Sequence, residues 1–124
     1  MVYVDSFRDL EVYKLSRELA SSIFEITKRF PNEEKFSLTD QVRRSSRSIG
    51  AQIAEAWAKR RYEKHFISKL TDADGEQQET QHWIEIACDC EYLNESEATQ
   101  LIAEYQKLGK MLGTMIRKSS SFCK

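Results

Sequence analysis

Cationic side chains offer the most direct chemistry in this chain. Lysine and arginine bind phosphate oxygens by charge, and the planar guanidinium group of arginine adds paired hydrogen bonds. Residues 43–64 contain seven such cations and two acidic residues, which gives this segment a net charge of +5. The seven cations are the candidate nucleic-acid-binding residues: Arg43, Arg44, Arg47, Lys59, Arg60, Arg61 and Lys64.

Internal ion pairing is the competing interpretation for three of these arginines. Residues 66–97 contain one lysine and nine acidic residues, a net charge of −8. If the two segments form antiparallel helices joined near residue 61, facing positions sum to about 122. The expected pairs then join Arg43, Arg44 and Arg47 to Asp74, Glu76 and Glu79. For the four cations around the turn, the competing interpretation is an ordinary solvated turn.

Metal-dependent chemistry is not expected. Glu79 and His82 have the Glu-x-x-His spacing of di-iron helical bundles, but such sites need a second copy of the motif and two further inward carboxylates. His65 is the only other histidine, and Tyr62 stands three residues before it. No Ser-His or Cys-His arrangement and no glycine-rich phosphate loop is visible. The sequence therefore predicts no enzyme, no metal site and no cofactor.

Polar residues also interrupt the apolar rows of two expected helices. A catalytic use would need a nucleophile with a placed base or paired acids in a cleft. We expect instead a hydrogen-bonded layer that fixes helix register or a subunit contact, because buried polar groups need partners. The members of this layer are Gln52, Glu55, Glu76, Gln77 and Thr80.

Apolar residues recur every three or four positions along four segments, the period of amphipathic helices. The expected helices cover about residues 6–29, 37–60, 62–92 and 95–118. Pro31 ends the first, Ser37-Leu38-Thr39-Asp40 approximates a capping box for the second, and Asn94 or Ser96 caps the fourth. Residues 119–124 should form a loose tail. The fold class is all-α, an antiparallel up-down-up-down four-helix bundle in one domain, residues 1–124.

Composition sets the wider expectations. The chain has 124 residues and a net charge of −1, and no segment reads as a signal peptide or is apolar enough to cross a membrane. Three cysteines without a disulfide framework fit the cytoplasm. Tyr13, Phe24 and Trp83 exceed the needs of one core, and exposed apolar surface usually marks an interface. We therefore expect a homo-oligomer.

Several motifs resemble one protein family. They are SIGAQIAEAW at residues 48–57, FISKL at residues 66–70, the pattern Glu79-Thr80-x-x-Trp83-Ile84-Glu85, and the opening FRDLEVYKLSRELASSIFEITKRFPNEE. In this order and spacing they resemble the four-helix-bundle proteins encoded in intervening sequences of bacterial 23S ribosomal RNA genes. The likeness runs from Phe7 to about Ile116. Gln52 stands where many relatives have Asn, and Ala56 where many have Gly.

The resemblance implies an up-down-up-down bundle that assembles as a ring of five. A distant branch of similar proteins, the accessory proteins of diversity-generating retroelements, is strongly basic, binds nucleic acid and engages a reverse transcriptase. Our leading hypothesis is a non-enzymatic oligomeric bundle that binds RNA or DNA through a basic rim. The alternative is a scaffold or ring platform that binds another protein and no nucleic acid.

Overall fold

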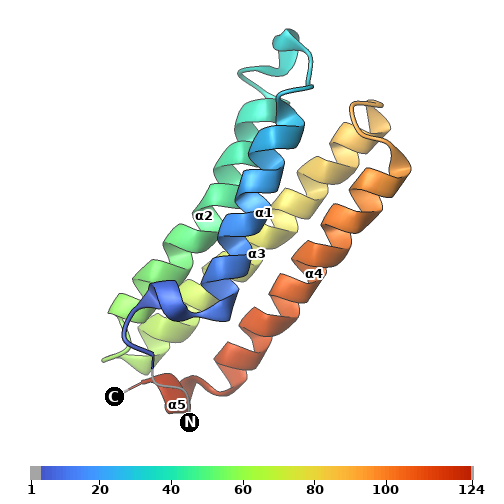
Figure 1. The fold of residues 1–124 in the computed structure, drawn as a ribbon. Coiled ribbons are helices and arrows are strands. Elements are labelled where there is room, and N and C mark those ends of the chain that lie inside the picture. Colours follow the sequence, from blue (N-terminus) through green and yellow to red (C-terminus); the bar gives the residue numbers. More distant parts are fainter. Residues whose placement is uncertain (1–3, 124) are drawn as a thin grey trace.

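The computed structural model describes residues 4–123, and within that range it consists of helices and turns without a strand (Figure 1). A short 3₁₀ turn, η1, precedes the first long helix, and a second, η2, precedes the next. In chain order the elements are η1 (Phe7–Asp9), α1 (Glu11–Thr27), η2 (Asn32–Glu34), α2 (Leu38–Ala58), α3 (Glu63–Asp89), α4 (Glu95–Arg117) and α5 (Ser119–Phe122).

The four long helices form the bundle that the sequence predicts. Each packs on the next in chain order, and α1 also packs on α4. Successive helices run in opposite directions, so α2 and α4 end at the same end of the molecule (Figure 1). None of the helices in the described part of the chain is long and apolar enough to cross a membrane.

The start of the first helix differs from the expectation. The helix begins at Glu11, not near residue 6, because Leu10 has extended backbone angles that separate α1 from η1. Ser6 caps η1 by accepting a hydrogen bond from the backbone N–H of Arg8 at 3.2 Å. Pro31 is extended, as expected after the end of α1.

The expected capping box at Ser37 is wrong. Ser37 Oγ donates a hydrogen bond to Glu34 Oε1 at 2.7 Å, and Glu34 instead accepts from the backbone N–H of Leu38 at 3.3 Å. A complete capping box does form at the start of α4. There Asn94 accepts from the backbone of Glu97 and Glu97 accepts from the backbone of Asn94.

The chain end is also more ordered than a loose tail. Ser119–Phe122 form α5, whose Phe122 ring stacks on buried Phe66 with 6.0 Å between ring centroids. Ser119 is buried and donates a hydrogen bond to the carboxylate of Glu63. Lys124 lies outside the described residues.

Buried polar residues occupy the centre of α3. Thr80 has no exposed surface, and its hydroxyl lies 2.8 Å from that of Ser45 on α2. Gln77 is 4% exposed, donates to Asp74 at 2.9 Å and accepts from Gln81 at 2.7 Å. These hydrogen bonds offset the cost of removing the polar groups from water.

Tyr105 is the exception to this pairing. Its side chain has no exposed surface, and its hydroxyl has no hydrogen-bond partner among the described residues. Burial raises the pKa of this hydroxyl above its ordinary value. The hydroxyl therefore stays protonated and, unlike those of Thr80 and Ser45, remains without a hydrogen bond among the described residues.

Two glycines give a matched test of how closely α3 and α4 pack. A Cβ atom at Gly109 would lie 2.7 Å from Gln77 Nε2, whereas a Cβ at Gly75 would meet nothing within 4 Å. We expect Gly75→Ala to stabilise the protein by about 0.5–1 kcal/mol through helix propensity. Gly109→Ala should destabilise it by about 1 kcal/mol, because Gln77 must move and weaken its hydrogen bonds.

Urea unfolding of the two variants beside the parent protein measures the difference. Equal stabilisation by both alanines would show that the α3–α4 contact is loose at Gly109.

Candidate nucleic-acid interface

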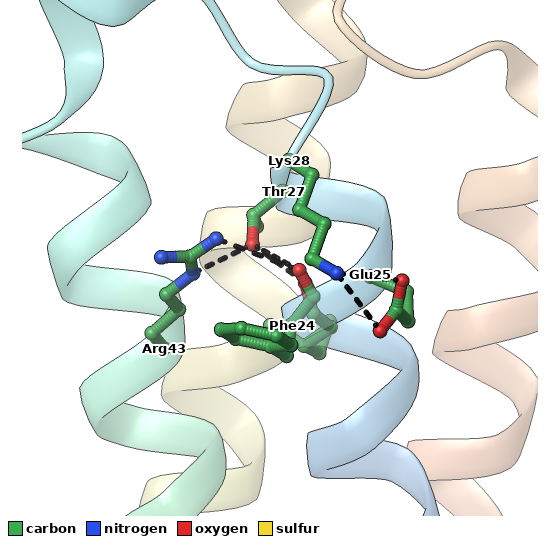
Figure 2. Close-up of polar contacts among 6 residues, drawn as sticks. Phe24, Glu25, Thr27, Lys28 and Arg43 are labelled. Carbon is green, nitrogen blue, oxygen red and sulfur yellow. Dashed lines mark hydrogen bonds and ion pairs between the residues drawn. The ribbon is translucent and has the colours of Figure 1, made fainter.

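Arg43 extends from α2 towards α1, not towards α3. Its Nε donates to Thr27 Oγ1 at 2.8 Å, and its Nη2 lies 3.5 Å from the carbonyl oxygen of Phe24 (Figure 2). The guanidinium group also lies over the Phe24 ring, 4.7 Å from its centroid. Arg43 is thus held by a hydroxyl, a carbonyl and an aromatic face, and its reach towards a ligand is restricted.

The other two arginines of this helix also miss the acids of α3. Arg44 pairs with Asp40 of its own helix at 3.8 Å, and Arg47 lies over the Phe24 ring at 5.7 Å. No ion pair within residues 4–123 joins an α2 arginine to Asp74, Glu76 or Glu79. The predicted pairing is therefore wrong.

The predicted register between α2 and α3 is close to the observed one, but the arginines lie on a face of α2 that does not meet α3. The hydroxyls of Ser45 and Thr80 meet, and Lys69 Nζ lies 3.4 Å from Gln52 Oε1, so facing positions sum to values close to the expected 122. Arg43 and Arg47 stand four residues apart and therefore share a face of α2. That face is directed at α1.

A groove of about 460 Å³ follows the contact between α1 and α2. Small residues form much of its lining, among them Ser16, Ala20, Gly50, Ala51 and Ala54, and Tyr13, Phe24 and Arg47 also border it. Phe24 is 37% exposed, and Tyr13 and Trp83 are half-buried. These are the three aromatic residues that the sequence marks as surplus to one core.

The remaining four candidates gather at the turn between α2 and α3. Arg60 is held in place, because its guanidinium group lies 3.6 Å from the centroid of the Trp57 ring and its Nε donates to the Trp57 carbonyl at 2.9 Å. Lys59, Arg61 and Lys64 are exposed. None of these three takes part in an ion pair within the described part of the chain.

Two further cations reach the same end of the bundle from α4. Arg117 is the last residue of α4, Lys118 follows it, and both are exposed. The next residue, Ser119, bonds to Glu63 in the first turn of α3, which fixes this end of α4 beside the α2–α3 turn. Arg117 and Lys118 are not among the seven candidates that the sequence indicates. Two signals point to them: residues 105–124 contain five cations and no acidic residue, and α2 and α4 run in the same direction.

We call Lys59, Arg60, Arg61, Lys64, Arg117 and Lys118 the basic end. Lys59 and Lys118 are the C-cap residues of α2 and α4, where positive charge complements the helix dipole. The N-terminal segment with Asp5 and Asp9 also comes to this end of the bundle, which moderates its charge (Figure 1). The opposite end holds the acidic α3–α4 turn with Asp89, Glu91 and Glu95.

The five residues of the expected polar layer do not form one layer. Thr80 bonds to Ser45 at the α2–α3 contact, and Gln77 packs under Gly109 at the α3–α4 contact. Gln52 and Glu55 lie near the surface, where both approach Lys69 Nζ, at 3.4 and 3.8 Å. The expected layer is a set of separate contacts, because its members lie at the α2–α3 contact, at the α3–α4 contact and near the surface.

Among the described residues, Glu76 is the member of the expected layer whose side chain makes neither a hydrogen bond nor an ion pair. Partial burial raises its pKa above the ordinary value of 4.5, and the neighbouring carboxylates Glu79 and Asp72 raise it further. Glu79 itself accepts a hydrogen bond from Trp83 Nε1 at 3.0 Å.

Both side chains of the Glu-x-x-His motif, Glu79 and His82, contact Trp83. Glu79 bonds to the indole N–H, and the exposed His82 ring packs edge-on against the indole with centroids 4.7 Å apart. No group of three or more potential metal-ligating side chains occurs within residues 4–123.

Fold and surface together define an all-helical four-helix bundle with cations gathered at one end. Residues 8–114 match the model of the 23S rRNA-intervening sequence protein family. The match spans most of the 124 residues, and the chain therefore belongs to this family.

One solved structure supports the same assignment. It is a protein of unknown function from the S23 ribosomal protein family of Bacteroides thetaiotaomicron, 33% identical to this chain with a TM-score of 0.77. The similarity covers 86% of this chain and 95% of that protein. No curated protein matches the chain.

Glu76 gives a pH-dependent test of the α3 surface. The pKa of Glu76 is higher in the folded protein than in the unfolded chain. The contribution of Glu76 to the free energy of unfolding is therefore most favourable below the ordinary pKa of 4.5, where the carboxyl is protonated in both states, and it is lost as the pH rises through the pKa of the folded state. Glu76→Gln should therefore stabilise the protein at pH 7, by about 0.5 kcal/mol, and the gain should disappear near pH 4.

Thermal unfolding across this pH range, with Glu79→Gln as the control, measures the effect. The control should gain less, since it weakens the hydrogen bond from Trp83. A Glu76→Gln gain that does not change with pH would contradict the assignment to charge.

Proposed function

We propose that this protein is a non-enzymatic, oligomeric helical bundle that binds RNA or DNA through its basic end. The observation that carries the proposal is the convergence of two basic segments, from the α2–α3 turn and from the end of α4, on one end of a protein with a net charge of −1. Phosphate binding by such a surface needs local charge and not a basic protein as a whole.

The structure changes the order of importance among the seven sequence candidates. Arg43 and Arg47 are engaged with Phe24, Arg44 with Asp40, and Arg60 with Trp57. Lys59, Arg61 and Lys64 are exposed without an ion-pair partner among residues 4–123. We assign phosphate binding first to these three and then to Arg117 and Lys118.

Assembly strengthens the proposal. The resemblance to relatives that form rings of five supports a homopentamer, and the exposed Phe24 beside the α1–α2 groove supplies apolar surface for a subunit contact. Repeating a weak phosphate-binding surface around one axis raises overall affinity by orders of magnitude. Nucleic-acid binding is also what the similarity to retroelement accessory proteins implies. Three free cysteines, Cys88, Cys90 and Cys123, are consistent with the cytoplasm as its location.

A protein-binding scaffold is the second candidate function. Phe36 favours it, because this side chain is 88% exposed on the connection between α1 and α2, at the end opposite the basic end. An exposed aromatic side chain on an ordered loop is a common anchor for a protein partner. If the parent protein binds neither RNA nor DNA in the assays described below, this candidate becomes the leading one.

The binding test compares charge reversal at the two ends of the bundle. Binding of labelled RNA and DNA should weaken steeply with added salt, because each neutralised phosphate releases counterions. Arg61→Glu combined with Lys64→Glu should weaken binding by about tenfold or more. The slope of log affinity against log salt concentration should fall in magnitude by about one for each lost phosphate contact.

The control is Lys28→Glu combined with Lys35→Glu, which makes the same change in charge away from the basic end. Fluorescence anisotropy at several salt concentrations measures both variants. Equal weakening by the two pairs would show that total charge, and not the basic end, governs binding.

The assembly has its own measurement. Light scattering at micromolar concentration should give about five times the single-chain mass of 14.5 kDa. A mass of one chain would contradict the oligomer and would leave the basic end to act without avidity.

A further inference from the structure

Tyr62 stands exposed within the basic end. Its side chain is 59% exposed, and Lys59, Arg61 and Lys64 lie within three residues of it in the chain. The tyrosine belongs to the turn before α3 and lies outside the buried row of that helix. The ring is therefore accessible to a ligand that binds at these cations.

The backbone around Tyr62 is held firmly. Its N–H donates to the Lys59 carbonyl at 2.9 Å, and its own carbonyl accepts from the backbone N–H groups of His65 and Phe66, each at 3.0 Å. Tyr62 is thus the N-cap residue of α3. On one side of it, Arg60 is stacked on Trp57, so this part of the turn is also fixed.

This rigidity matters for binding. A surface that is already in its binding conformation loses little conformational entropy when a ligand is bound. The exposed His65 ring lies beside the Tyr62 ring, with 5.5 Å between centroids, and limits its freedom further. The turn therefore presents one aromatic face at a defined position next to unpaired cations.

The other exposed aromatic side chains have different surroundings. Within the described residues, the exposed large hydrophobic side chains are Phe24, Phe36 and Tyr62. Cations from Arg43, Arg47 and Lys28 already lie over the Phe24 ring. Lys35 Nζ already lies over the Phe36 ring, 5.4 Å from its centroid, and Glu33 and Glu34 precede Phe36 in the chain. Tyr62 combines an accessible ring with cations that are free to bind phosphate.

We propose that Tyr62 is a stacking platform for an unpaired base of single-stranded RNA or DNA, whose backbone phosphates Lys59, Arg61 and Lys64 bind. Every base has a face that stacks on an aromatic ring, so this contact tolerates sequence variation. In a duplex the bases are already stacked and paired, and the ring has no base to receive. The inference rests on the proposed function and adds a preference for single strands to it.

The test uses one single-stranded oligonucleotide of about twelve nucleotides and the duplex of the same sequence, each labelled for anisotropy. Tyr62→Ala should weaken single-strand binding by about tenfold and leave duplex binding and the salt dependence unchanged. Tyr62→Phe should keep parent affinity, because the ring and not the hydroxyl makes the contact. Phe36→Ala, at the other end, is the matched control and should change neither affinity.

The outcomes separate this inference from the function on which it rests. Equal loss of single-strand and duplex binding in Tyr62→Ala, or equal loss in Tyr62→Phe and Tyr62→Ala, would overturn the stacking role. If Tyr62→Ala binds normally while reversal of Arg61 and Lys64 weakens binding, the stacking role fails and the proposed function stands. If neither variant differs from the parent protein, or the parent binds no oligonucleotide, both are overturned.

Discussion

The packing of this bundle depends on the polar centre of its third helix. Gln77 and Thr80 are buried in the middle of α3, at positions that a simple bundle would fill with leucine. Each needs a hydrogen bond, and each reduces the space available to the helix it faces. Ser45 on α2 supplies the partner for Thr80, and Gly109 on α4 leaves room for Gln77. The small residues on either side of α3 are therefore a consequence of its polar centre.

Small residues of α2 also face α1. A Cβ atom at Gly50 would lie 3.2 Å from Ser16 Oγ, so the two helices approach closely there. The same face of α2 directs Arg43 and Arg47 onto the Phe24 ring, where a cation and an aromatic face attract each other. Two arginines that look available for phosphate are thereby used within the fold. Of the seven cations between residues 43 and 64, those that are exposed without an ion pair or an aromatic contact are Lys59, Arg61 and Lys64, at one end of the bundle.

The charge of the chain has meaning only when its position in the bundle is known. Helices in an up-down bundle alternate in direction, so α2 and α4 end at the same end of the bundle although about sixty residues separate their last residues. Cations at helix C-termini are favourable for the helices themselves. Stability and phosphate binding therefore favour the same residue types at the basic end, and the charge-reversal experiment must compare the two ends of the bundle to separate them.

By itself, the sequence determined the four helices, their order, their approximate register and the likeness to one family, because helical period, caps and breakers are local signals. It also indicated that Gln77 and Thr80 would need partners. The helical period shows which residues share a face of a helix, but it does not show which neighbouring helix that face meets. For this reason the tertiary structure alone decided that Arg43 lies on Phe24, that the polar layer divides, and that α5 packs on Phe66. It also decided which cations share an end with Tyr62, because that grouping follows from packing between segments far apart in the chain.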